Sequence, residues 1–314
     1  MSPDAPMNTG APVSPDVPRR KEAKRWSGRS VGGAWLLVPG LWLLRRFGLR
    51  GSLICSVPIA TLLLLIAGPA RAATIDYWRR LHPQAGGDRH WALAIRHWSA
   101  FGRVLCDRLL AYTDSNLVVD FSGRDADRLK SAVAAGGCML LSAHVGNWEL
   151  AGRMLSRLPT KQVHLVFAGG ESPQVRAVVN AAMGDVGDRA PSIIDPRGGL
   201  QATFAIRNAL ANGEIVCMLG DRALPEAPRI RVPFLGSLAD LPSGPLRLAA
   251  TCQAPLLACF LLKSSRRSYR IKVVGPLHLS GRPGPATVAA WGRLLEYVVR
   301  AAPNQWHNFY RFWP

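Results

Sequence analysis

Acidic side chains are scarce in this sequence, which has 20 Asp and Glu against 39 Lys and Arg and a formal net charge of +19. Residues 1–50 carry nine Lys and Arg against three acidic residues, a net of +6, so +13 remains on the rest of the chain. A basic surface of this kind favours anionic lipid, nucleic acid or an acidic carrier protein as partner. Charge alone does not choose among the three.

Several motifs that identify common enzyme classes are missing. There is no G-x-S-x-G nucleophile elbow of a serine hydrolase and no H-E-x-x-H zinc helix. No G-x-x-x-x-G-K-[ST] or G-x-G-x-x-G loop follows a predicted strand, which leaves nucleotide binding without support. Nucleic-acid binding would require a recognisable module of basic and aromatic residues, and none is found. We therefore expect no nucleic-acid partner, no metal ion and no bound cofactor.

The six cysteines lie apart in apolar stretches, and no two of them form a C-x-x-C pair. This distribution indicates buried thiols in a reducing compartment rather than a disulfide frame or a zinc site. Because this compartment is reducing, we expect the main domain to be cytoplasmic.

Hydrophobic residues make up 48% of the 314 residues, which suffices for one α/β domain with a large core and an appendage.

The amino-terminal region combines a polar tail with two short apolar blocks. Residues 1–18 are rich in Pro, Ser, Ala and Asp, and a basic cluster follows, so we expect 1–30 to be a disordered basic tail. The apolar blocks 34–44 and 53–69 are short or marginal against the ~20 residues that a spanning helix needs. We predict that residues 31–75 form a membrane-anchoring helical segment.

Several interpretations of this segment remain open. A cleaved signal peptide would use Ala-Arg-Ala-Ala at 70–73, but the apolar segment begins some fifty residues into the chain. A spanning helix would place the main domain outside, yet Arg71, Arg79 and Arg80 make the second flank basic as well. A monotopic or re-entrant anchor keeps both basic flanks at the anionic face of the membrane, and we favour it over a buried core helix. The expected location is the cytoplasmic face of a bacterial inner membrane.

Beyond the anchor, the pattern predicts an α/β domain over residues 76–314. Residues 76–112 have a helical pattern, and from about residue 138 short apolar runs alternate with helical stretches. This alternation favours a mixed sheet flanked by helices. The expected strands are 138–143, 162–168, 192–195, 214–219, 256–262 and 270–275, and the expected helices are 147–157, 173–183, 199–212, 243–252 and 285–301.

The most informative stretch is Leu-Ser-Ala-His-Val-Gly-Asn-Trp-Glu-Leu, residues 141–150. His144 follows a strand, Gly146 permits an unusual backbone conformation, and Asn147 is a good N-cap for the next helix. The edge where strands lead into helices is where open α/β sheets bind ligands. We expect Glu149 to fold back towards His144, where a carboxylate would fix the imidazole tautomer and stabilise the imidazolium.

This stretch resembles the His-x4-Asp/Glu motif of the glycerolipid and lipid A acyltransferase superfamily. The residues Gly-Asn-Trp-Glu within this motif are similar to those of the lipid A late acyltransferases, the lauroyl/myristoyl transferase branch. The residues beside Asp221 differ from those common in the lipid A enzymes, so the acceptor stays open. Further blocks resemble this branch in order, so that the likeness covers about residues 35–314: Leu219–Arg222, Val232–Gly236, Leu241–Pro245, Ala254–Leu257 and Gln305–Trp313.

The resemblance implies an acyltransferase with a glycerolipid acyltransferase-like fold. His144 would act as general base and Glu149 as its partner, while Gly146, Asn147, Asp221 and Arg222 would bind substrate. The co-substrate would be an acyl carrier protein or coenzyme A thioester, and the acceptor a lipid at the membrane.

The chemistry agrees with these residue types, because a thioester is already activated. The enzyme must mainly deprotonate the acceptor and stabilise an oxyanion. Backbone N–H groups near Asn147 would serve the oxyanion, Arg222 a phosphate or the phosphopantetheine, and Asp221 would order its loop. An ordinary surface salt pair is the alternative for Asp221 and Arg222.

Two other functions remain as alternatives. A non-catalytic basic protein that binds anionic lipid would explain the charge and the anchor, but it gives no reason for His144 with Glu149. A lipid thioesterase or hydrolase would use the same pair to activate water. The products, free fatty acid or acylated lipid, distinguish hydrolysis from transfer.

Overall fold

The computed structural model describes Arg46 and residues 57–110, 117–155, 162–167, 191–224, 226–277, 279, 281 and 283–314. Within these residues the chain alternates helices and strands. The helices are α2 (Gly68–Leu81), α3 (Gly87–Leu110), α4 (Gly123–Ala134), α5 (Trp148–Leu155), α7 (Leu200–Ala211), α8 (Gly244–Thr251) and α9 (Pro285–Ala301). The strands are β1 (Val118–Asp120), β2 (Cys138–Ser142), β3 (Val163–Val166), β4 (Ser192–Ile194), β5 (Ile215–Leu219), β6 (Arg229–Phe234), β7 (Ser237–Pro242), β8 (Leu256–Lys263) and β9 (Ser268–Val274).

The main sheet has seven strands in the order β1-β9-β8-β2-β5-β3-β4. The strands β8, β2, β5, β3 and β4 run parallel to one another, whereas β9 is antiparallel to β8 and β1 is parallel to β9. The sheet is therefore mixed, as predicted. A separate antiparallel hairpin, β6–β7, packs against α9.

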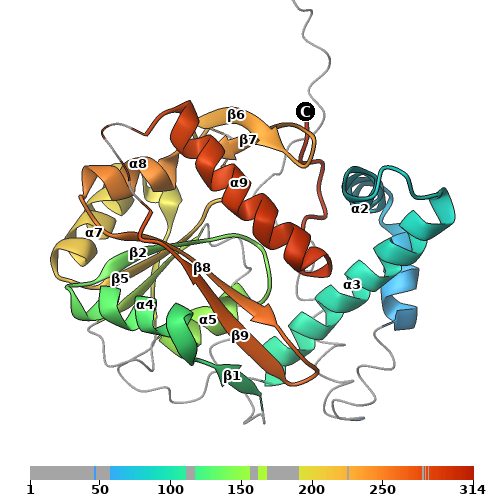
Figure 1. Ribbon diagram of the computed structural model, residues 1–314, viewed down its shortest axis with the longest axis horizontal. Helices are drawn as coiled ribbons and strands as arrows, with labels where there is room; N and C mark the ends of the chain where they lie inside the picture. Colours follow the sequence, from blue (N-terminus) through green and yellow to red (C-terminus); the bar gives the residue numbers. More distant parts are fainter. Residues whose placement is uncertain are drawn as a thin grey trace, which may run out of the picture.

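Helices cover both faces of the sheet because successive side chains of its central strands point to opposite sides. Met139 and Leu141 of β2 face a core shared with α7, α8 and α9. Cys138 and Leu140, from the same strand, face a second core shared with α4 and α5. In Figure 1, α8 and α9 lie above the sheet and α4 lies below it.

The predicted elements were largely found. All six expected strands are present within two residues of their predicted limits, as are four of the expected helices. The expected helix 173–183 lies outside the described residues. The pattern at 76–112 is two helices, α2 and α3, with a turn containing Pro83 between them. The strand β1, the helix α4 and the β6–β7 hairpin were not among the predicted elements.

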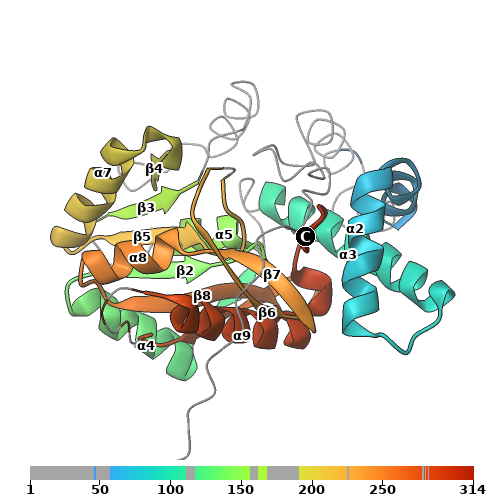
Figure 2. The ribbon, with the colours of Figure 1, turned by 90° about the horizontal axis from the view of Figure 1, so that it is seen from above.

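The helices α2 and α3 lie beside the sheet domain rather than on a face of the sheet, as Figures 1 and 2 show. They contact each other, and α3 contacts the short helix Pro303–Gln305 that follows α9. The predicted limit of the anchoring segment, residue 75, lies within α2.

No single helix among the described residues is long and apolar enough to cross a bilayer. The helix Val57–Ile66 and α2 together have sufficient length and apolar character, but they are bent by 107° at their junction. Leu62, Leu65 and Ile66 expose 59%, 54% and 67% of their surface. The block 34–44 lies outside the described residues, and membrane anchoring stays a prediction.

Candidate functional site

His144 lies just beyond the carboxyl end of β2, at the centre of the sheet. Its neighbours Ala143 and Val145 are fully buried, so the backbone enters and leaves this position through the core. The side chain of His144 keeps 19% of its surface exposed. The imidazole is thus carried by a buried stretch of backbone and keeps part of its surface accessible.

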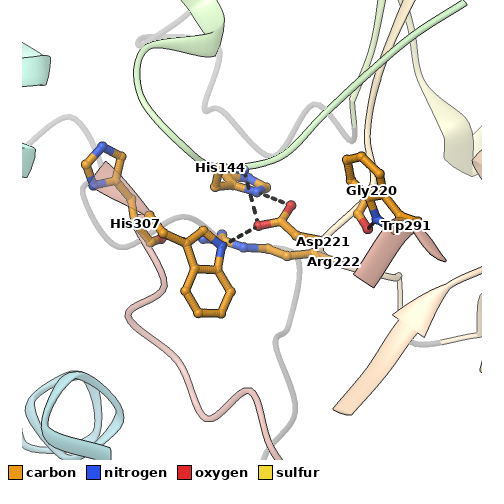
Figure 3. A network of polar contacts seen from close by, with 7 residues as sticks. His144, Gly220, Asp221, Arg222, Trp291 and His307 are labelled. Carbon is orange, nitrogen blue, oxygen red and sulfur yellow. Dashed lines mark hydrogen bonds and ion pairs between the residues drawn. The ribbon is translucent and has the colours of Figure 1, made fainter. Parts of the chain in front are cut away.

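Asp221 contacts His144 because their strands are neighbours. Leu219, the last residue of β5, is paired with Ser142, the last residue of β2. The side chain two residues after β5 therefore meets the side chain two residues after β2. His144 Nδ1 lies 2.8 Å from Asp221 Oδ1, and the backbone N–H of His144 donates to Oδ2 at 3.1 Å (Figure 3).

This contact assigns the tautomer of His144. Asp221 is 1% exposed, and although burial raises its pKa, the charge and hydrogen bond of His144, followed by Arg222 and Trp306, hold the pKa well below its usual range. A carboxylate can only accept hydrogen bonds, so Nδ1 of a neutral His144 carries the proton and Nε2 carries the lone pair. Among the described residues, no group is hydrogen-bonded to Nε2. It is therefore available as a base.

The pKa of His144 is lowered from its ordinary value. Burial is the largest cause and the positive charge of Arg222 the second, while Asp221 acts in the opposite direction. Both lowering effects disfavour the imidazolium. His144 is consequently neutral at neutral pH, as a general base must be before it accepts a proton.

Gly146 and Asn147 shape the turn after His144. Gly146 has φ +70°, and a Cβ at this position would lie 2.0 Å from the Leu261 carbonyl oxygen, so only glycine fits. Asn147 Oδ1 accepts the backbone N–H of Leu150 at 3.1 Å, which confirms it as the N-cap of α5. These two residues therefore place α5 directly beside the catalytic candidate.

Oxyanion support was expected from backbone N–H groups near Asn147, and two of the N–H groups in this turn are already hydrogen-bonded. The N–H of Gly146 donates to the Gln305 carbonyl at 2.8 Å, and that of Asn147 donates to the Leu261 carbonyl at 2.9 Å. These bonds fix the turn between β2 and α5 to β8 and to the end of the chain. Gly146 and Asn147 therefore offer no free N–H to an oxyanion, and oxyanion support by the other N–H groups at the start of α5 stays a prediction.

Glu149 is the second residue of α5, five residues after His144. Its side chain lies outside the described residues, so its predicted role as partner of His144 stays a prediction. The partner of Nδ1 in the structure is Asp221, for which loop ordering and substrate binding were expected. The available signal was the sheet order, because the two residues follow adjacent parallel strands.

Arg222 lies beside the His144–Asp221 pair (Figure 3). Its Nη2 donates to the His307 carbonyl at 2.6 Å, and its guanidinium lies 5.0 Å from the centroid of the Tyr310 ring. The alternative of a surface salt pair between Asp221 and Arg222 is thus wrong, because Asp221 is buried and bonded to His144. Arg222 instead ties the site to the end of the chain.

Two tryptophans hold the Asp221 segment. The Trp291 indole N–H donates to the Gly220 carbonyl at 2.7 Å (Figure 3), and the Trp306 indole N–H donates to Asp221 Oδ2 at 3.1 Å. Trp306 comes from the stretch Gln305–Trp313, for which the sequence showed a resemblance to the family but no site residue was predicted. The ending is therefore part of the site.

Comparison with known proteins shows the family to which the chain belongs. Over residues 20–314 the chain matches the bacterial lipid A biosynthesis acyltransferase family, and it belongs to that family. Two curated relatives are named phosphatidylinositol mannoside acyltransferase, from the H37Rv and CDC 1551 strains of Mycobacterium tuberculosis. Each is 26% identical over 192 residues, or 60% of this chain and 58% of the relative. The chain thus spans less than two thirds of these relatives, and the predicted family is confirmed.

Proposed function

We propose that this protein transfers a fatty acyl group from an acyl thioester to a hydroxyl or amine of a lipid acceptor at a membrane surface. The hydrogen bond between His144 Nδ1 and Asp221 Oδ1 carries the proposal. It leaves Nε2 as a neutral, accessible base in a chain of the acyltransferase family.

In this mechanism Nε2 of His144 removes the proton from the acceptor as its oxygen or nitrogen attacks the thioester carbonyl carbon. Asp221 stabilises the imidazolium that forms. The tetrahedral intermediate then collapses, its carbon–sulfur bond breaks, and the thiolate takes the proton from Nε2. One ester or amide bond is formed, one thioester bond is lost, and His144 returns to its neutral state.

Arg222 supplies positive charge close to the reacting atoms. It acts on the pKa of both His144 and Asp221, which places its charge near the base. A preorganised cation near a developing oxyanion stabilises the transition state more than the ground state. We assign this role to Arg222 in place of the N–H groups of Gly146 and Asn147.

The acceptor is proposed from the family and the relatives. The family is named for lipid A biosynthesis, and the relatives are named for the acylation of phosphatidylinositol mannoside. Lipid A and phosphatidylinositol mannoside both carry sugar hydroxyls. A sugar hydroxyl of an envelope glycolipid is therefore the first acceptor to test.

Attachment to the membrane is proposed from the surface of the helix Val57–Ile66. Leu62, Leu65 and Ile66 are exposed, and Arg71 follows on the adjoining helix with its guanidinium bonded to the Leu65 carbonyl. Apolar side chains next to cationic ones suit the interface of an anionic bilayer. This supports a monotopic or re-entrant anchor at the cytoplasmic face of the inner membrane.

An acyl carrier protein is the proposed donor. The turn between β8 and β9 carries Arg266 and Arg267, both exposed, at the carboxyl end of β8. Because β8 is parallel to β2, this turn lies at the same edge of the sheet as His144. An acidic carrier would be attracted to this edge, with its thioester directed to the site.

Lipid mass spectrometry tests the proposed function. The host's lipids are compared among cells that carry the wild-type protein, the His144→Ala variant and no protein. We expect one class of acylated lipid only with the wild type. Free fatty acid in its place would identify a hydrolase, and identical lipid profiles would favour the non-catalytic lipid-binding alternative.

A further inference from the structure

Residues 305–307 are hydrogen-bonded to the backbone on both sides of Val145, the residue that follows His144. The backbone N–H of His307 donates to the His144 carbonyl at 2.8 Å, and the N–H of Gly146 donates to the Gln305 carbonyl at 2.8 Å. The segment 305–307 therefore runs alongside the turn that carries the base. The side chain at its centre belongs to Trp306.

Trp306 is fully buried, and its indole N–H has one specific partner. Nε1 donates to Asp221 Oδ2 at 3.1 Å. Its ring is held among aromatic side chains, with centroids 4.9 Å from Phe312, 5.2 Å from Tyr77 and 5.4 Å from Phe234. An indole fixed in this way directs a single donor at the carboxylate that holds His144.

We propose that Trp306 is a positioning residue of the reaction, which sets the basicity of His144 through Asp221. This inference rests on the proposed function, in which His144 is the base and Asp221 its partner. It assigns to the aromatic end of the chain a part in proton transfer as well as in packing.

The effect follows from how Asp221 shares its negative charge. Oδ1 bonds the imidazole, while Oδ2 accepts from the His144 backbone and from Trp306. Hydrogen bonds to a carboxylate stabilise its charge and lower its basicity. Without the indole donor, Asp221 would be more basic and would stabilise the imidazolium more strongly. The pKa of His144 would rise, and the orientation of the carboxylate would be less well fixed.

Two variants of Trp306 test this. Trp306→Phe keeps an aromatic ring, and Trp306→benzothienylalanine keeps the full bicyclic shape with sulfur in place of the N–H. We expect kcat to fall about tenfold in both, since hydrogen bonds to charged groups have about this weight. The acid limb of kcat/KM should move to higher pH. An acid limb that stays in place or moves to lower pH in the benzothienylalanine protein would overturn the proposal.

Trp291→Phe is the matched control. It removes a buried indole N–H whose acceptor is the Gly220 carbonyl, next to Asp221 in the chain but not its carboxylate. We expect a lower melting temperature and an unmoved acid limb, and an equal shift in this variant would also overturn the proposal. His144→Ala and Asp221→Asn are assayed in parallel. Full activity in those two would refute the proposed function itself, whereas their inactivity beside an unshifted Trp306 variant would refute only the role of Trp306.

Discussion

Asp221 accepts a hydrogen bond from Nδ1 of His144 at 2.8 Å, although 76 residues separate them in the chain. The pair forms because β2 and β5 are adjacent and parallel and end at the same level. The order of the strands in the sheet, and not the local sequence around His144, thus places the Asp221 carboxylate beside the imidazole. The buried carboxylate fixes which nitrogen of His144 is free to act.

The first prediction separates the two carboxylates that could assist His144. Asp221→Asn would place an amide N–H against Nδ1 and reverse the tautomer, so that Nε2 could no longer accept a proton. We expect a loss of kcat on the order of 10³–10⁴-fold. Glu149→Gln should cost less than Asp221→Asn if Asp221 is the tautomer-fixing partner. Steady-state kinetics with unfolding curves for both proteins make the comparison, and the reverse order would return that role to Glu149.

The second prediction concerns the pH dependence of activity. Burial and Arg222 lower the pKa of His144, and the base must be neutral to act. Activity should therefore rise with pH through this lowered pKa, so the acid limb of kcat/KM lies below the usual histidine value of about 6.5. Arg222→Gln should move the limb to higher pH. Arg207→Gln, an exposed arginine on α7, should leave it in place.

Much of the fold could be predicted from local patterns. The strands β2, β5 and β8 are continuous apolar runs, as buried parallel strands are, and Asn147 capped α5 as expected. In the β6–β7 hairpin, the apolar residues Val232 and Phe234 lie at alternate positions, as in a half-buried strand. Pro233 lies between them and argues against a strand, and the hairpin was missed.

The site could be predicted only in part. Local sequence was enough to propose His144 as the candidate base, because the recognisable turn and cap residues Gly146 and Asn147 follow it. The role of Asp221 depends on which strands are neighbours in the sheet. The role of Trp306 depends on the contact between residues 305–307 and the turn after β2. Both contacts join residues that are far apart in the sequence, and such contacts cannot be predicted from local periodicity or motif spacing.

The third prediction concerns acid stability. His97 is completely buried, its Nε2 lies 2.8 Å from the Trp306 carbonyl oxygen, and burial lowers its pKa from 6.5 to about 4. Between these values the unfolded chain binds more protons, so stability is full above pH about 6.5 and is lost as pH falls towards 4. His97→Gln keeps a donor but does not titrate. Denaturant unfolding should show about 2 kcal/mol less destabilisation between pH 7 and 5 in this variant, and an unchanged pH dependence would contradict the assignment.

The fourth prediction tests attachment. Leu62→Ser, Leu65→Ser and Ile66→Ser together remove exposed apolar surface from the helix Val57–Ile66. Binding to anionic phospholipid vesicles should weaken at least about tenfold, because each buried aliphatic side chain contributes about 1.5–3 kcal/mol. Flotation with the vesicles measures it.

The control for attachment removes exposed aliphatic side chains from the sheet domain. Ile193→Ser, Leu200→Ser and Leu238→Ser alter residues that are 53%, 76% and 54% exposed. These changes should leave flotation unaltered. Equal loss in the two triple variants would show that the helix Val57–Ile66 is not the membrane-binding surface.

The last prediction concerns the donor. Arg266→Glu with Arg267→Glu reverses the charge of the β8–β9 turn at the edge of the sheet that carries His144. For an acyl carrier protein thioester, kcat/KM should fall about tenfold or more at low salt, because steering of an acidic partner is lost. The loss should shrink at high salt, where attraction is screened within about 10 Å. A coenzyme A thioester should be affected much less.

The control for the donor is Lys130→Glu with Arg207→Glu. These exposed residues lie on α4 and α7 near the ends that lead into β2 and β5, and so towards the opposite edge of the sheet. The control should keep the preference for the carrier-protein donor, measured in detergent without anionic lipid so that membrane binding does not contribute. Equal use of both donors by the wild type at low salt would mean that the positive charge of the turn serves the membrane instead.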